Sequence, residues 1–312
     1  MKRFAALLSL AGSPLAAQDV PPAPATEVAT VLDVGEDRVA RMTVPVDIDG
    51  RGTYAFIVDT GAERTAISAE LADDLKLVLG RMARVHSMTE VSRIQTVRIP
   101  ALTVGGRKVR DIDAPTLTRR NIGAQGILGV DSLQKQRVSF DFAREQMTVT
   151  ASYKREEKWP DDTIVVTARN RLGHLVLVDA SVDGQKVWVI IDTGAQTTVG
   201  NSVLRQKLAR KGRIGRSWPI ELESVTGGRI GAEAALVKLI RIGGSDIHDM
   251  PIAFADVHPF KALNLMDRPA LLLGMDALRL FERVSVDFPN RRVRLLPPEG
   301  SERQGSDYAA AD

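Results

Sequence analysis

The sequence contains one unusual motif twice, and this repeat limits the folds that the chain can adopt. The segments AFIVDTGAERTAIS (residues 55–68) and WVIIDTGAQTTVG (residues 188–200) both run from apolar residues directly into Asp-Thr-Gly-Ala. A carboxylate at the end of a buried strand is costly, because burial disfavours its charged form. Two copies of this arrangement indicate an internal duplication in which the two acids work together.

The residues around each motif also recur in the same order. Asp49-Gly50 and Asp183-Gly184 precede the two motifs and are typical of tight hairpin turns. After each motif comes a short β-branched piece and then a helix candidate, for which Ser68 and Asn201 are suitable N-caps. Each half is therefore expected to contain a hairpin, the acid and a short helix.

A second block recurs further along each half, as GILGVDSLQKQRVSFDF within residues 126–149 and LLLGMDALRLFERVSVDF within residues 271–295. Val and Ile occur in short runs bounded by Gly, Asp-Gly or Pro, which is typical of many short strands. A chain of 312 residues with 44% hydrophobic composition can build two domains with cores of their own. The sequence predicts an all-β protein made of two related lobes.

The composition divides the chain into six segments. The polar stretch ASYKREEKWPDD, which contains a proline, suits a linker between the lobes, and the end of the chain lacks apolar periodicity. We expect a signal peptide (1–17), a Pro/Ala-rich flexible segment (18–30), an N-terminal lobe (31–150), a linker (151–162), a C-terminal lobe (163–297) and a disordered tail (298–312).

The N-terminus resembles a secretory signal peptide, with a basic start, an apolar stretch from Phe4 to Leu15 and the small residues Ala16 and Ala17. The alternative, a buried N-terminal helix, is disfavoured because the segment that follows is rich in proline and alanine. We expect export to the periplasm or secretion. No other segment is long enough to span a membrane, so none is expected in the mature protein. Residues 18–40 could be an inhibitory pro-region or a flexible lead-in, and their composition favours the lead-in.

Several function classes are disfavoured by composition. The absence of cysteine rules out thiolate nucleophiles, disulfides and cysteine metal sites. His86, His174, His248 and His258 lack metal-site spacing and are expected at ordinary structural or surface positions, so no metal is predicted. No nucleotide or serine-hydrolase motif is present, and no cofactor is expected. The basic run at residues 205–216 contains no aromatic residue and the overall charge is only +3, so no nucleic-acid partner is predicted.

Two buried carboxylates can coexist when they share one proton, and the pair then supplies an acid and a base at once. The charged member can deprotonate a water molecule, while the protonated member binds an amide carbonyl and later helps to protonate the leaving nitrogen.

Neighbouring residues fit this arrangement in three ways. Gly61 and Gly194 would let the backbone turn sharply and bring N–H groups against the carboxylates. Thr60 and Thr193 would lock the junction through their hydroxyls. The hydrophobic-Gly pairs would form a dry floor beneath the acids; they are Leu128-Gly129 and Leu273-Gly274.

These motifs together resemble the aspartic protease superfamily, and its compact bacterial retropepsin-like members more than the vertebrate pepsins. Two DTGA motifs, each followed by a hydrophobic-hydrophobic-Gly block, are much more specific than a single Asp-Thr-Gly. The resemblance implies two pseudo-symmetric β-barrel lobes with a short helix in each and a cleft between them. It also implies Asp59 and Asp192 as the catalytic dyad, Thr60 and Thr193 as interlocking threonines, and an extended peptide or protein substrate covered by β-hairpin flaps. A monomer would suffice because both halves lie in one chain, and a dimer remains possible.

Two departures from the family pattern lead to further expectations. Thr226, Gly227 and Gly228 suit a flexible flap tip in lobe two, whereas residues 84–95 of lobe one contain no glycine, so closure could be one-sided. Ala62 and Ala195 stand where pepsins have a serine that could donate to each carboxylate. Because lost donors raise the pKa of a carboxylate, we expect activity at mildly acidic to near-neutral pH.

One alternative function and two further recurring acids remain to be considered. The fold could bind peptides without cutting them, although a protein without catalysis gains little from a buried carboxylate pair. Asp131 and Asp276, which also recur in both halves, are interpreted as helix-capping residues.

Overall fold

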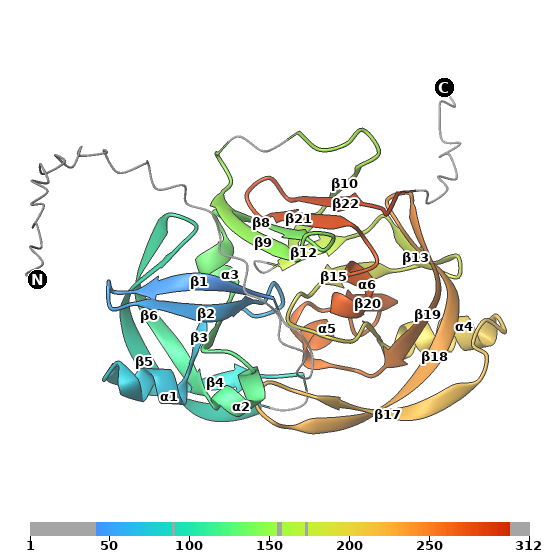
Figure 1. Cartoon of the computed structure of the whole chain (residues 1–312). Helices are drawn as coiled ribbons and strands as arrows, with labels where there is room; N and C mark the ends of the chain where they lie inside the picture. Colours follow the sequence, from blue (N-terminus) through green and yellow to red (C-terminus); the bar gives the residue numbers. More distant parts are fainter. Residues whose placement is uncertain (1–41, 89–90, 155–157, 172–173, 300–312) are drawn as a thin grey trace, which may run out of the picture.

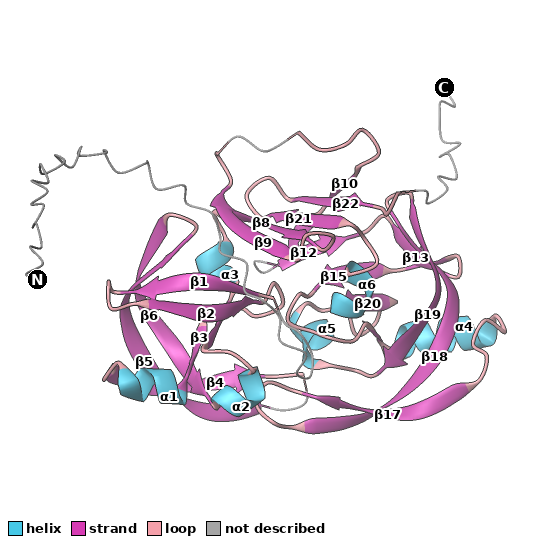
Figure 2. Cartoon of the chain, viewed as in Figure 1, coloured by secondary structure: helices cyan, strands magenta, loops and turns pink. Residues whose placement is uncertain are grey.

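The computed structural model describes residues 42–88, 91–154, 158–171 and 174–299 (Figure 1). The expected signal peptide, the Pro/Ala-rich segment and all but the first two residues of the expected tail lie outside these ranges. The described residues form a mostly β protein with short helices and two lobes, which confirms the predicted fold class (Figure 2). Within the described residues, no helix is long and apolar enough to cross a membrane.

Lobe one is a small barrel. Its seven-stranded sheet has the order β1-β2-β7-β3-β6-β5-β4, and β1 also pairs with β5, which closes six of the strands into a ring. Its elements are β1 (Thr43–Ile48), β2 (Thr53–Val58), β3 (Ala66–Ser68), α1 (Ala69–Asp74), β4 (Val78–His86), β5 (Val91–Val104), β6 (Arg107–Leu117), α2 (Arg119–Ile122), β7 (Gly126–Leu128) and α3 (Val130–Leu133).

Lobe two repeats the strand order of lobe one as β12-β15-β20-β16-β19-β18, with β13 and β17 also paired to β18. The strand that carries its acid, β15, pairs in parallel with β20, as β2 pairs with β7 in lobe one. Its elements are β11 (Arg169–Arg171), β12 (His174–Leu177), β13 (Ala180–Val182), β14 (Gln185–Lys186), β15 (Trp188–Ile191), β16 (Val199–Gly200), α4 (Ser202–Arg210), β17 (Ser217–Glu223), β18 (Arg229–Ile242), β19 (Ser245–Phe254), α5 (His258–Ala262), β20 (Ala270–Leu273) and α6 (Met275–Leu278).

A separate five-stranded sheet joins the lobes, in the order β10-β22-β21-β8-β9. Strands β8 (Gln136–Asp141) and β9 (Gln146–Ala151) come from the first half, and β10 (Ile164–Thr167), β21 (Arg283–Asp287) and β22 (Arg292–Leu296) from the second. In the central antiparallel pair, Ser139 of SFDF lies opposite Ser285 of SVDF, and their hydroxyls are 3.1 Å apart. The second repeated block therefore pairs with its own copy and fixes one lobe against the other.

The expected turns and helix caps are present. Asp49-Gly50 and Asp183-Gly184 have positive φ at both residues, as tight hairpin turns require. The Ser68 hydroxyl accepts a hydrogen bond from the Leu71 N–H at 3.1 Å, and the Asn201 carbonyl oxygen accepts one from the Leu204 N–H at 2.9 Å. These interactions hold the chain where it leaves each acid-bearing loop.

Candidate active site

The two acids lie immediately after the strands that lead into the cleft between the lobes. The Asp59 N–H donates to the Leu128 carbonyl at 3.0 Å, and the Asp192 N–H donates to the Leu273 carbonyl at 3.1 Å. Each acid loop is therefore anchored to the strand of its own hydrophobic-Gly block. The sequence prediction placed Leu128 and Leu273 beneath the acids, and both are fully buried there.

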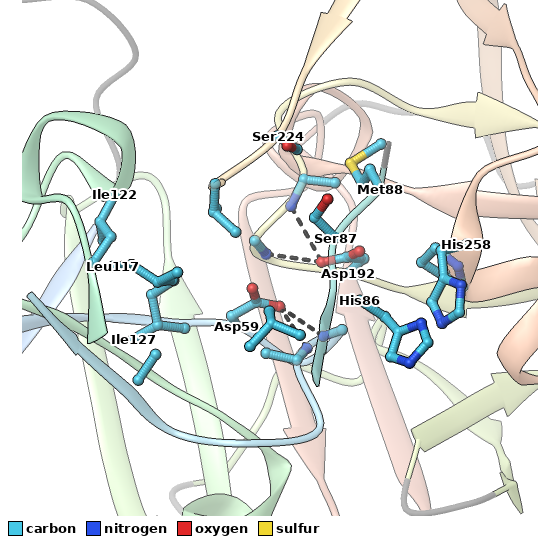
Figure 3. A pocket seen from close by; sticks show the side chains of 18 of the residues that line it. Asp59, His86, Ser87, Met88, Leu117, Ile122, Ile127, Asp192, Ser224 and His258 are labelled. Atoms are coloured by element: carbon cyan, nitrogen blue, oxygen red, sulfur yellow. Dashed lines mark hydrogen bonds between the residues drawn. The ribbon is translucent and has the colours of Figure 1, made fainter. Parts of the chain in front are cut away.

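Each carboxylate is held by the backbone of its own loop (Figure 3). Asp59 Oδ1 accepts hydrogen bonds from the N–H groups of Gly61 at 2.8 Å and Ala62 at 2.9 Å. Asp192 Oδ1 accepts the equivalent bonds from Gly194 at 3.0 Å and Ala195 at 3.1 Å. In each acid one oxygen is held by the backbone, so the other is available to the opposite acid and to a ligand.

The two carboxyl groups interact directly. Asp192 is only 6% exposed, and the Asp59 carboxyl group lies close to it. Burial raises the pKa of Asp192 well above its usual value, and the nearby charge and side chain of Asp59 act in the same direction. The N–H groups of Gly194 and Ala195 oppose this shift without cancelling it. Asp192 therefore holds a proton more readily than an ordinary aspartic acid.

Thr60 and Thr193 connect the two acid loops reciprocally. The Thr60 hydroxyl donates to the Ile191 carbonyl at 2.7 Å, and the Thr193 hydroxyl donates to the Val58 carbonyl at 2.7 Å. These bonds join each loop to the strand that carries the other acid. The predicted interlocking role of the two threonines is thus present in the geometry.

Gly61 and Gly194 make the expected N–H contacts with the carboxylates, and the structure adds a further reason for glycine at both positions. Neither has the positive φ that would require glycine for a sharp turn. A Cβ at Gly61 would instead collide with the Asp192 carboxyl group, and a Cβ at Gly194 with that of Asp59. Each glycine leaves room for the acid of the opposite lobe, so the pair can approach only because both positions lack a side chain.

The floor residues Gly129 and Gly274 are also positions of close backbone approach. A Cβ at Gly129 would meet the backbone of Arg64 and Thr65, and one at Gly274 would meet the backbone of Thr197 at 2.8 Å. The N–H of each floor glycine donates to a threonine hydroxyl, that of Thr65 at 3.2 Å in lobe one and that of Thr198 at 3.1 Å in lobe two.

The helix-capping interpretation of Asp131 and Asp276 was wrong. Gly129 and Gly274 occupy the N-cap positions of α3 and α6. The Asp131 carboxylate accepts from the Thr65 N–H at 2.9 Å and from the Thr65 hydroxyl at 2.7 Å. Asp276 makes the equivalent bonds to Thr198. These acids hold the segment after each DTGA motif, a role that the spacing alone did not reveal.

A cleft of about 930 Å³ surrounds the two acids. Apolar side chains of both lobes line it, and Figure 3 shows Leu117, Ile122 and Ile127 facing it from lobe one. Leu222 and Leu263 line it from lobe two. The volume lies within the range typical of small-molecule and peptide side-chain sites.

A hairpin from each lobe reaches across this cleft. In lobe two, Val225 packs against the apolar cluster of lobe one, and a Cβ at Gly227 would lie 2.9 Å from the Asn121 amide nitrogen of α2. In lobe one, residues 84–88 line the cleft, and Met88 packs against the apolar cluster of lobe two. The sequence left open whether lobe one contributes such a hairpin, because glycine was used as the signal for a flap and residues 84–95 contain none.

Three histidines that the sequence treated as ordinary lie at the cleft. His86 and His258 line it from opposite lobes, and the buried His174 places Nδ1 3.1 Å from the Thr60 carbonyl oxygen. They come from β4, α5 and β12, so no sequence spacing could have grouped them. Among the described residues, no cluster of three or more His, Asp or Glu has the arrangement of a metal site.

Comparison with known families agrees with this geometry. Residues 44–135 match the family of gag-polyprotein putative aspartyl proteases, and residues 178–277 match a second family described as aspartyl protease. No curated protein matches the chain. Each of the two lobes has a strand that is followed directly by Asp-Thr-Gly, and both Asp-Thr-Gly loops lie at the same cleft. This arrangement defines a two-lobed acid protease fold. The chain belongs to the retropepsin-like aspartic protease family.

Proposed function

We propose that this protein is an aspartic endopeptidase that hydrolyses peptide bonds at one composite site formed by Asp59 and Asp192. The observation that carries the proposal is the close approach of the two acid loops, in which Gly61 lies against the Asp192 carboxyl group and Gly194 against that of Asp59, together with the raised pKa of Asp192. A pair that shares one proton contains a base and an acid in contact with the same ligand.

The proposed reaction needs only this pair and a water molecule. Asp59 takes a proton from the water, whose oxygen attacks the amide carbon, while Asp192 donates its proton to the carbonyl oxygen. The tetrahedral diol then collapses: one hydroxyl returns its proton to Asp192, the carbon–nitrogen bond breaks, and the leaving nitrogen takes up the proton held by Asp59. No covalent bond to the protein forms. This step restores the starting state, with Asp59 charged and Asp192 protonated.

The substrate would be an extended peptide lying between the lobes and beneath the two hairpins. The cleft has apolar walls on both sides of the acids, with Leu117 and Ile127 in lobe one and Leu222 and Leu263 in lobe two. We propose that apolar side chains flank the bond that is cut, because burying each one contributes roughly 1.5–3 kcal/mol.

Export to the periplasm or outside the cell is part of the same proposal and depends on residues 1–17, whose composition resembles a signal peptide. Both acids come from one chain, so a monomer would contain the complete site.

Cleavage of a mixed peptide library tests the proposal, between about pH 3 and pH 8 to cover the titration of a carboxyl pair. Wild type is compared with Asp59→Asn and Asp192→Asn, and with Asp74→Asn on the exposed surface of α1 as the matched control. The proposal predicts cleavage by wild type and the control only. Peptide binding without cleavage by wild type, independent of both acids, would replace it with a peptide-binding function.

A further inference from the structure

The β4–β5 hairpin of lobe one is docked on helix α5 of lobe two by contacts that lie beside the two acids. The imidazole rings of His86 and His258 are stacked, with centroids 4.2 Å apart and planes inclined by 21°. Next to the stack, the backbone N–H of His258 donates to the Met88 carbonyl oxygen at 3.4 Å. The Met88 side chain packs against the apolar cluster of lobe two, and Figure 3 shows the paired rings beside Asp59 and Asp192.

The docked hairpin covers the cleft without filling it. Ser87, between His86 and Met88, is only 5% exposed, and all three residues line the cleft. The cavity of about 930 Å³ is nevertheless present with the hairpin in this position. A peptide can therefore lie beneath a docked hairpin, and docking would help to enclose it and exclude water.

We propose that His86 and His258 are positioning residues that hold this hairpin across the cleft while at least one of the two imidazoles is neutral. When both rings are charged they repel each other, the hairpin is released and peptide binding weakens. This inference rests on the proposed function only in taking a peptide as the ligand.

The charges around the stack favour this behaviour. Two imidazolium rings at 4.2 Å would repel each other. Burial lowers the pKa of His258, and the charges of His86 and Lys261 on α5 lower it further, whereas Glu63 in the first acid loop opposes the shift. Arg84, two residues before His86 on the same strand, adds positive charge at this wall of the cleft.

The sign of the pH effect follows from the lowered pKa. Docking favours neutral His258, so its contribution is complete above the unperturbed imidazole pKa of about 6.5. It is lost as the pH falls through the lowered pKa of the docked state. The hairpin is therefore held at neutral pH and released in acid.

The first test separates peptide binding from turnover. KM is expected to rise about fivefold for wild type between about pH 7 and pH 5, because the apparent affinity scales with the docked fraction, whereas kcat follows the carboxyl pair. His86→Phe/His258→Phe keeps two stacked rings that cannot be charged, so its KM should stay level. His86→Lys/His258→Lys, which carries two charges at both pH values, should have a raised KM at both. The same pH-dependent rise in the Phe pair would overturn the proposal.

A second test needs no activity, so its result does not depend on the proposed function. The chain contains no cysteine, and spin labels can be placed selectively at Arg93→Cys on β5 and Lys207→Cys on α4, both exposed. Without peptide, the distance distribution should broaden on acidification in the otherwise wild-type protein and remain narrow in the Phe pair. An unchanged wild-type distribution contradicts the proposal, even if peptides are cleaved. If the wild-type distribution broadens and the Phe pair prevents this broadening, the proposal is supported even if no peptide is cleaved.

Discussion

Thr60 and Thr193 bind each other across the junction of the two lobes. The Thr60 N–H donates to the Thr193 hydroxyl oxygen at 3.2 Å, and the Thr193 N–H donates to the Thr60 hydroxyl oxygen at 3.1 Å. Each hydroxyl in turn donates a hydrogen bond to a carbonyl oxygen of the opposite lobe. All four groups are buried, and the two acids that follow the carbonyl-bearing strands are fixed by this network.

Replacing either threonine by valine should therefore destabilise the junction. Thr60→Val keeps the shape but leaves the Thr193 N–H and the Ile191 carbonyl unpaired, at a cost of about 3 kcal/mol in the free energy of unfolding. Urea denaturation measures this loss. Thr60→Ser keeps the hydroxyl and should recover most of it, and Thr53→Val on the exposed part of β2 is the matched control. Equal stabilities of Thr60→Val and Thr53→Val would contradict the assigned role.

Substitution of the acid-loop glycines should impair the acid pair more than the fold. Gly61→Ala places a methyl group against the Asp192 carboxyl group and Gly194→Ala places one against that of Asp59, so the pair must separate. A displacement of this kind can cost about 100-fold in kcat. The matched control is Gly231→Ala in β18, where a Cβ would meet nothing within 4 Å. The test is to compare kcat for one cleaved peptide between the three variants and wild type. A wild-type kcat in Gly61→Ala would refute the geometric argument.

The raised pKa of Asp192 predicts how activity and stability depend on pH. In the proposed mechanism Asp192 donates its proton, so kcat should fall as the pH rises through the raised pKa, and the optimum should lie at mildly acidic to near-neutral pH. A raised folded-state pKa also stabilises the protein fully below the unfolded value and progressively less as the pH rises through the folded value. Asp192→Asn should thus gain stability relative to wild type between about pH 4 and pH 8. Thermal unfolding of both proteins across this range tests the prediction. A constant difference would mean that the Asp192 pKa is ordinary.

Asp131 should be important for stability although it lies outside the acid pair. Asp131→Ala leaves the buried Thr65 N–H without its acceptor and removes one of the two partners of the Thr65 hydroxyl, so we expect a loss of about 2–4 kcal/mol in unfolding free energy. Asp74→Ala at the exposed end of α1 should cost under about 0.5 kcal/mol. Chemical denaturation compares the two. A similarly small effect of Asp131→Ala would show that Thr65 is held by other contacts.

The sequence predicted the features that local chemistry determines. Tight turns at Asp49-Gly50 and Asp183-Gly184, and caps at Ser68 and Asn201, depend on residues within a few positions of each other, so their letters were sufficient. The acid pair was also predictable, because the duplication showed two equivalent carboxylates that had to meet about a common axis.

Features that depend on contacts between distant segments were not predictable in this way. The Ser139–Ser285 pairing joins strands far apart in the chain, and the two copies of the block gave no sign that they would pair with each other. Gly61 was expected to turn the chain and to bring its N–H group to the carboxylate, but the collision that it avoids with Asp192 of the other lobe could not be predicted. The His86–His258 stack likewise joins a strand of one lobe to a helix of the other.

The central claim, that Asp59 and Asp192 form one catalytic unit, is tested most directly by a double-mutant cycle on one identified peptide substrate. The account predicts that kcat falls at least ~1,000-fold in Asp59→Asn and in Asp192→Asn, and that the double variant is no slower than either, because residues that act as a unit are not additive. Substantial turnover by one single variant, or losses that multiply in the double variant, would show that the two acids act separately and would contradict it.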